Sequence, residues 1–134
     1  MELISRCDNP PHELPHGRRR PWQGFSARTW RTPTRFANFP GGSRVEIFQL
    51  EDVVVGRTIW LPGWRWSEVV KPIAGTELCE YHHLGYSVSG RFRAAMPDGT
   101  EMEIPPNHVY EIPSGHDAWV VGDDAFETVE IAGI

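Results

Sequence analysis

Long hydrophobic runs and cysteine are both scarce in this sequence. No stretch of its 134 residues approaches the roughly 20 consecutive apolar residues that a membrane-spanning helix needs. The first residues also lack the apolar segment of a signal peptide, because Pro, His and Arg crowd them. Cys7 and Cys79 are the two cysteines, which is too few for a disulfide framework. We therefore expect a cytoplasmic protein whose thiols are reduced.

An excess of basic charge is also lacking, which removes the general reason to expect a nucleic-acid partner. The net charge is −5 at pH 7, but it is unevenly distributed. Residues 1–35 carry seven Arg and three acidic residues, whereas residues 36–134 carry six basic and fifteen acidic residues. The basic run GRRR at residues 17–20 fits a solvated or packed arm better than a nucleic-acid contact.

The first quarter of the chain reads as an arm. Residues 8–24 are rich in Pro and Gly, so they cannot form a helix interior or a central strand. We expect an extended arm over residues 1–35 and one barrel domain over residues 36–134, because this length suits a single domain with a real core. Trp22, Phe25 and Trp30 would anchor the arm on its own barrel or on a neighbouring subunit.

Gly and Pro divide the remaining chain into short segments. The longest run without either is residues 43–55, and its β-branched residues favour a strand over a helix. Asp98-Gly99, between two alternating segments, predicts a type I′ hairpin turn. Regular short strands with such turns predict an all-β antiparallel sandwich or barrel. The expected strands are residues 43–55, 56–61, 80–89, 91–96, 100–104, 108–112, 118–121 and 126–131.

Two stretches gather polar side chains beside expected strands. Residues 77–90 (ELCEYHHLGYSVSG) place a thiol, two imidazoles and carboxylates ahead of an apolar strand. Residues 107–122 (NHVYEIPSGHDAWVVG) place Ser-Gly-His-Asp before another apolar strand. Side chains alternate along a strand, so the adjacent His82 and His83 must face opposite sides, and we expect His83 to face inward. These stretches predict a small-molecule site inside the barrel.

Both stretches resemble the two sequence motifs of the cupin superfamily. YSVSG, ending at Gly90, resembles the end of the first motif. PPNHVYEI followed by Pro113-Ser114-Gly115 resembles the second, with Asn107 where the family usually has Gly. The residues between the motifs, RFRAAMPDGTEMEIPP, have the family's length and hairpin. The resemblance covers about residues 43–131 and implies a double-stranded β-helix, or jelly roll, that pairs into a homodimer.

The ligand positions of the cupin motifs are changed in this chain. In the first motif, counted back from Gly90, they hold Glu77, Cys79 and His83, which would share one face of a continuous strand. In the second motif, Ala118 stands where His is usual, and His116 lies two residues earlier. A second alignment, through the Pro62-Gly63 turn, would place Trp66 and Glu68 near the first two positions instead.

Two interpretations of the site are open. The residues that would bind a metal are Cys79, His83, His116 and Glu77. Their thiolate, imidazole and carboxylate groups suit one divalent transition metal, Zn²⁺ or Fe²⁺. Without a metal, His83 and His116 would act as general acid and base, with Tyr86 or Asp117 orienting one of them.

Tryptophans flank the motifs. Trp60, Trp64 and Trp66 alternate before the first motif, and Trp119 follows the second. Such a stripe is more often core than a binding wall, but at the mouth of a cupin barrel it can serve as both. The residues expected to contact a substrate are Trp64, Trp66, Trp119 and Asp117.

The resemblance implies a small-molecule enzyme of the cupin type. Its chemistry would be that of a lyase, isomerase or dehydratase, or metal-assisted oxygen chemistry. The alternative, from another functional class, is a non-catalytic cupin that binds or senses a ligand. The fold supports many functions, so the motifs alone do not choose between these.

Overall fold

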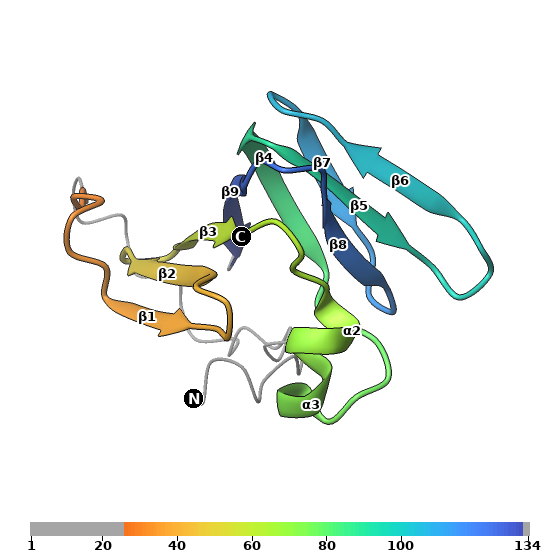
Figure 1. Ribbon diagram of the computed structural model, residues 1–134. Coiled ribbons are helices and arrows are strands. Elements are labelled where there is room, and N and C mark those ends of the chain that lie inside the picture. The colour runs from red at the N-terminus through yellow and green to blue at the C-terminus, as the bar shows by residue number, and fades with distance from the viewer. Residues whose placement is uncertain (1–25, 133–134) are drawn as a thin grey trace.

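The computed structural model describes residues 26–132, which form two antiparallel β-sheets packed as a sandwich (Figure 1). The larger sheet has the strand order β1-β2-β3-β9-β4-β7, and the smaller one has the order β6-β5-β8. The prediction of an all-β antiparallel sandwich is confirmed. The predictions for Cys7, the GRRR run, Trp22 and Phe25 lie outside the described residues.

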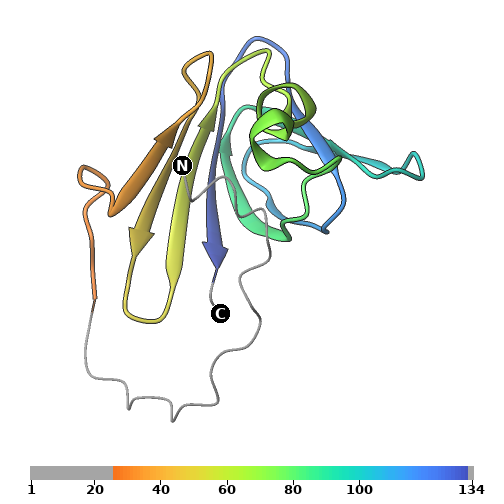
Figure 2. The ribbon, with the colours of Figure 1, turned by 90° about the horizontal axis from the view of Figure 1, so that it is seen from below.

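Nine strands and two short helices make up the described part of the chain. The strands are β1 (Arg35–Asn38), β2 (Arg44–Gln49), β3 (Val54–Trp60), β4 (His83–Ser89), β5 (Arg91–Ala95), β6 (Glu101–Ile104), β7 (Val109–Ile112), β8 (Asp117–Val121) and β9 (Phe126–Ala132). The helices are α2 (Trp66–Val69) and α3 (Lys71–Ala74). They lie at one end of the sandwich, on the connection between β3 and β4 (Figures 1 and 2). Within residues 26–132 no helix is long and apolar enough to cross a membrane.

The structure differs from the sequence prediction at one strand and at one turn. The strand predicted over residues 43–55 is broken at Glu51-Asp52, where the Leu50 N–H donates to the Val53 carbonyl at 2.9 Å, and Gly56 lies inside β3. The Asp98-Gly99 hairpin is confirmed, but its turn is not type I′, because only Gly99 has a positive φ, of 90°. Pro97 precedes Asp98 and favours a type I turn, which a left-handed Gly then closes.

Three elements were not predicted from the sequence. β1 is four residues long and depends on pairing with β2, with which it shares the register Arg35↔Ile47. α2 and α3 are also four residues long, too short for a helical period to stand out. Pro72 near the start of α3 and the left-handed Gly75 at its end are nevertheless ordinary helix boundaries.

The core lies between the sheets. Phe92 of β5 stacks on Phe126 of β9 with ring centroids 4.5 Å apart, which joins the smaller sheet to the larger one. Trp64 stacks on Trp60 at 4.0 Å and also on Phe92 at 5.8 Å. Trp64 and Trp66 are both buried, so the interpretation of the tryptophan stripe as core is confirmed for these two.

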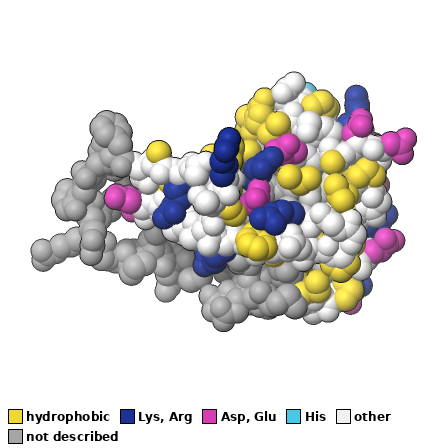
Figure 3. Space-filling model, turned by 60° about the vertical axis from the view of Figure 1, so that its left-hand side comes forward, with side chains coloured by type: hydrophobic (Ala, Val, Ile, Leu, Met, Phe, Trp, Pro, Cys, Tyr) yellow, Lys and Arg dark blue, Asp and Glu magenta, His cyan; other side chains and the backbone are white. Residues whose placement is uncertain are grey.

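The outer face of the larger sheet is partly covered by the chain that precedes β1. Trp30 packs edge-on against Phe48 with ring centroids 4.5 Å apart, and Arg28 Nε donates to the Gln49 carbonyl at 2.6 Å. Trp30 therefore anchors this segment on its own sheet. On the face shown in Figure 3, hydrophobic side chains lie among Arg, Lys, Asp and Glu.

Gly90 has a steric role at the turn from β4 to β5. Its φ is +78°, and a Cβ at this position would lie 2.1 Å from the Ala125 carbonyl oxygen and 2.8 Å from Phe126 Cα. Gly99 has a similar φ of +90°, but nothing lies within 4 Å of its Cβ position. Substitutions at Gly90 and Gly99 therefore distinguish the cost of backbone strain alone from the cost of strain plus steric overlap.

We predict that Gly99→Ala lowers the free energy of unfolding by about 1 kcal/mol, the cost of a left-handed residue with a Cβ. Gly90→Ala should lower it by about 3 kcal/mol or more, because backbone atoms of β9 must also move. Chemical denaturation of both variants measures the difference. Equal losses would contradict the close approach of β9 to Gly90.

Candidate functional site

A backbone bridge at one end of the sandwich brings two parts of the site together. The Cys79 N–H donates to the His116 carbonyl at 2.8 Å, and the Gly115 N–H donates to the Cys79 carbonyl at 2.7 Å. Cys79 precedes β4 of the larger sheet, and His116 precedes β8 of the smaller one. Both side chains are buried, with exposed fractions of 3% and 2%.

His83, the first residue of β4, adds a second imidazole. It lies on the inner face of the strand with the buried Gly85 and Ser87, whereas His82 is exposed and bonds to Glu111 at 2.6 Å. The predicted inward orientation of His83 is therefore confirmed. The strand predicted over residues 80–89 begins only at His83, so Glu77, Cys79 and His83 do not share the continuous strand that the motif spacing implied.

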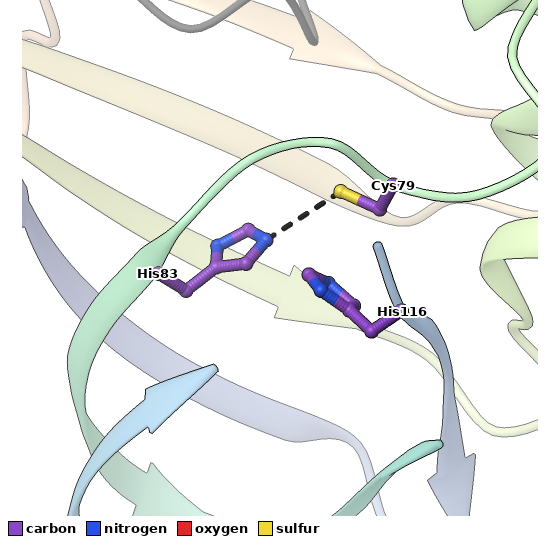
Figure 4. Close-up of side chains that lie close together, drawn as sticks. All are labelled: Cys79, His83 and His116. Atoms are coloured by element: carbon purple, nitrogen blue, oxygen red, sulfur yellow. Dashed lines mark hydrogen bonds between the residues drawn. The ribbon is translucent and has the colours of Figure 1, made fainter. Parts of the chain in front are cut away.

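Cys79, His83 and His116 form one cluster (Figure 4). Their ligand atoms all lie within 4.8 Å of one another, and Cys79 Sγ is 3.7 Å from His83 Nε2. The two imidazole centroids are 5.1 Å apart. A sulfur and a nitrogen bound to one tetrahedral zinc lie about 3.6 Å apart, given usual bond lengths. The separation of Cys79 Sγ and His83 Nε2 therefore already suits a shared metal ion, and the His116 ligand atom lies within 4.8 Å of both.

Hydrogen bonds at the far side of each ring orient both imidazoles. His116 Nδ1 donates to the Pro113 carbonyl at 2.6 Å. A carbonyl can only accept, so the proton sits on Nδ1 and the Nε2 lone pair remains available. His83 Nδ1 bonds in the same way to Glu130 Oε2 at 2.9 Å. Metal-binding histidines are typically held by such a carbonyl or carboxylate on the other nitrogen.

The charges of the site follow from burial and from these contacts. Burial, and then repulsion by the nearby His83 imidazole in its protonated form, lower the pKa of His116 to about 4 from 6.5. Burial by itself would raise the pKa of Glu130, but His83 and a hydrogen bond from Tyr110 bring that pKa below its ordinary value. Burial and the Glu130 charge raise the pKa of Tyr110. At neutral pH His116 is thus neutral, Glu130 is charged, and Tyr110 keeps its hydroxyl proton.

Other predicted site residues lie elsewhere in the fold. Glu77 is exposed and pairs with Lys71 at 2.7 Å. Tyr86 lies on the outer face of β4, where its hydroxyl donates to Asn107 Oδ1 at 3.0 Å. Trp64 and Trp66 belong to the core. Glu77 and Tyr86 therefore point away from His83.

Asp117 and Trp119 hold α2 against the outer face of β8. The Asp117 carboxylate accepts from Arg65 Nε at 3.0 Å and from the Ser67 N–H and hydroxyl at 3.0 and 2.9 Å. The Arg65 guanidinium lies over the Trp119 ring, 4.5 Å from its centroid. Glu68, which the second alignment would bring to the site, is exposed on α2.

Glu130 and Tyr110 are the site residues that the sequence prediction missed. β9 alternates Phe126, Thr128 and Glu130 on its inner face, so a carboxylate on the core side of an apolar strand was the available signal. Tyr110 has the same inward position on β7. Tyr110 lies within the stretch PPNHVYEI that resembles the second motif, but it is not a ligand position there, and Glu130 lies outside both motifs.

The cluster is open to solvent on one side. The His83 and Glu130 side chains are 22% and 24% exposed, unlike those of Cys79 and His116. A surface hollow of about 420 Å³ lies near the cluster. Its lining residues flank Cys79 and His116 in the chain, and they are Glu77, Leu78, Glu80, Ser114 and Gly115.

The turn before β7 contains a left-handed residue that is not glycine. Asn107, at the position where that motif usually has Gly, has a φ of +63°. Asn is one of the few residues that adopt this left-handed conformation readily. Asn107 can therefore take this turn conformation in place of the Gly that the resemblance leads one to expect.

No family model matches the chain, and no curated protein matches it. Solved structures do match. KdgF from Halomonas sp. is 18% identical, with 75% of this chain and 88% of that chain covered and a TM-score of 0.51. Protein VPA0057 from Vibrio parahaemolyticus is 13% identical, with 72% and 95% covered and a TM-score of 0.53. A cupin domain from Bordetella pertussis is 20% identical, with 67% and 91% covered and a TM-score of 0.47.

At these identities the similarity concerns the fold alone. The two antiparallel sheets packed as a sandwich agree with it. The expectation raised by the two motifs is thus confirmed for the architecture, and the chain has the fold of a small cupin.

Proposed function

We propose that this chain is a small-molecule enzyme of the cupin type in which Cys79, His83 and His116 hold one divalent transition metal. The observation that carries this proposal is the convergence of the three ligand atoms within 4.8 Å, with both rings oriented from behind. Three protein ligands leave a coordination position open, as in catalytic zinc sites. A bound ion would supply Lewis-acid polarisation of a substrate oxygen.

We infer that a small organic substrate approaches the cluster from its exposed side. His83 and Glu130 border it, whereas Cys79 and His116 lie behind them in the core. Lyase, isomerase or dehydratase chemistry fits Zn²⁺ at this site, and metal-assisted oxygen chemistry fits Fe²⁺. The identity of the metal would therefore separate these reaction classes. A reduced thiolate at Cys79 also fits a cytoplasmic location.

The metal-free acid–base mechanism has less support. It needs His83 and His116 to exchange protons with a substrate near neutral pH. Burial lowers the pKa of His116 to about 4, which leaves it a poor general acid there. A neutral imidazole is, in contrast, the form that binds metal ions.

A second candidate is a non-catalytic cupin that binds or senses a ligand. The observation in its favour is the near-complete burial of Cys79 and His116, which is more typical of a closed metal site than of an open one. In this second candidate the ion would be structural and closed to exogenous ligands, whereas the enzyme needs an open coordination position. Azide added to the Co²⁺-substituted protein would change its visible spectrum only if a coordination position is open.

We predict that the protein purified without a His-tag from metal-replete cells contains about one transition metal ion per chain. His83→Ala should remove it, because one of three ligands is lost. His82→Ala is the matched control, since His82 is the adjacent imidazole but faces solvent. Elemental analysis measures all three proteins. Metal-free wild-type protein, or metal retained by His83→Ala, would contradict the proposal.

The neutral, buried state of His116 predicts a pH dependence for the metal-free protein. The unfolded chain binds this proton near pH 6.5, whereas the folded chain binds it near pH 4, so stability is lost as the pH falls through this window. The loss attributable to His116 should be about 3 to 4 kcal/mol, from about 1.4 kcal/mol per pKa unit. Denaturation with EDTA present measures this as the difference between wild type and His116→Gln. Parallel pH profiles would refute a neutral, buried His116.

We propose in addition that the chain forms a homodimer. The outer faces of β4, β7 and β9 present exposed apolar side chains, namely Leu84, Tyr86, Val88, Val109 and Ile131. Tyr86 faces Val109 on one neighbouring strand and Val129 on the other, so the patch is continuous across the sheet. Contiguous apolar patches of this kind typically mark protein interfaces.

We predict that Val109→Asp, at a position 77% exposed, shifts the dimer towards monomer by about tenfold in Kd or more. Met102→Asp is the control, because Met102 is an exposed apolar residue on β6 of the other sheet. Sedimentation velocity measures both variants. A monomeric wild-type protein, or an equal effect of the two substitutions, would count against this interface.

A further inference from the structure

Three residues on neighbouring strands form one row across the larger sheet, next to His83. Tyr110 of β7 is the register partner of Gly85 on β4, and Gly85 is the register partner of Glu130 on β9. All three face the interior. Because the middle residue has no side chain, the Tyr110 ring can extend over β4 and reach Glu130.

Gly85 is needed for the space that this row requires. A Cβ at Gly85 would lie 2.6 Å from both Cζ and the hydroxyl oxygen of Tyr110, and 3.0 Å from Glu130 Cγ. Real Cβ atoms do not approach other atoms so closely. The backbone conformation of Gly85 is ordinary, so the glycine serves the contact between Tyr110 and Glu130 rather than a turn.

The row continues into the cluster through hydrogen bonds. The Tyr110 hydroxyl lies 2.8 Å from Glu130 Oε1, and Glu130 Oε2 lies 2.9 Å from His83 Nδ1. A carboxylate can only accept, so both Tyr110 and His83 donate to it. The Thr128 hydroxyl lies 2.6 Å from the Tyr110 oxygen and can donate to it in turn. Each carboxylate oxygen of Glu130 thus has its own donor.

We propose that Tyr110 is a positioning residue that acts through Glu130 on His83. The phenol holds one carboxylate oxygen, which leaves the other aimed at His83 Nδ1. This fixes the proton of His83 on Nδ1 and directs Nε2 towards Cys79 and His116. Without the phenol, the flexible Glu130 side chain loses one of its two anchors and can turn away from the ring.

The consequence for metal binding rests on the function proposed above. Loss of a residue that orients a metal-binding histidine typically weakens metal affinity by about 10- to 100-fold. We therefore expect Tyr110→Phe and Glu130→Gln each to weaken binding by about this factor. Because Tyr110 acts through Glu130, the double variant should bind no more weakly than Glu130→Gln alone.

Tyr81 offers a matched control. Its ring packs beside His83 with centroids 4.8 Å apart, and it is half-buried, but its hydroxyl is not part of the hydrogen-bonded row. Tyr81→Phe removes the same phenol oxygen from the same neighbourhood. It should leave the metal affinity within about twofold of the wild-type value, well below the loss expected for a lost orienting partner.

Two measurements on the full chain test this role. Competition with a chromophoric chelator gives the Zn²⁺ affinity of the wild type, Tyr81→Phe, Tyr110→Phe, Glu130→Gln and the double variant, each checked for folding by circular dichroism. Long-range ¹⁵N–¹H NMR of the metal-free proteins gives the tautomer of His83 directly. We expect the Nδ1–H form in the wild type and Tyr81→Phe, and a mixture of tautomers in Tyr110→Phe.

The positioning role is overturned if Tyr110→Phe keeps both the wild-type affinity and the wild-type tautomer, or if the two affinity losses add up in the double variant. Additive losses would mean that Tyr110 acts by a route other than Glu130. If the wild type binds no Zn²⁺, the proposed metal function fails. The NMR tautomer of His83 in Tyr110→Phe then decides the positioning role alone: a mixture supports it, and an unchanged Nδ1–H form overturns it.

Discussion

The backbone bridge between Cys79 and His116 is the contact on which the candidate site depends. The two residues come from segments that lead into different sheets, and their side chains would not meet without it. Peptide hydrogen bonds of 2.8 and 2.7 Å fix their relative position independently of any ligand. The site is thus built where the two sheets of the sandwich are joined, and the third member, His83, lies at the start of the strand that follows Cys79.

A polar row on the inner face of a sheet carries a cost that must be offset. Leaving a buried donor or acceptor without a partner costs about 1–3 kcal/mol, so such rows persist only when their groups are paired. Glu130, Tyr110 and Thr128 meet this condition, since each hydroxyl and each carboxylate oxygen has a hydrogen-bond partner. Gly85 provides the space in which the partners can meet. The same contacts that stabilise the row also orient His83.

Alternation along strands accounts for most of what the sequence could predict. It correctly separated the inward His83 from the outward His82, and the turn residues located the hairpin between β5 and β6. The same rule, applied fully, also places Tyr86 on the face opposite His83, where it lies. Local sequence patterns therefore predict the two-sheet fold and part of the site.

The remaining features depend on contacts between distant segments. Glu77 was assigned to the site by counting the motif spacing back from Gly90, but the pairing of β4 begins at His83, and Glu77 pairs with Lys71 instead. Asp117 faces α2, a helix of four residues with no periodic signal. Glu130 is separated from His83 by 47 positions, and only the pairing of β4 with β9 brings the two together. No local pattern could have predicted these contacts.

The central claim is that three side chains from the joined ends of the two sheets hold one metal ion. X-ray diffraction from crystals of the metal-replete protein, collected at the absorption edge of the metal, tests it most directly. The account predicts one anomalous peak within about 2.0 to 2.4 Å of Cys79 Sγ, His83 Nε2 and His116 Nε2. A peak located elsewhere, or no peak at this cluster, would contradict it.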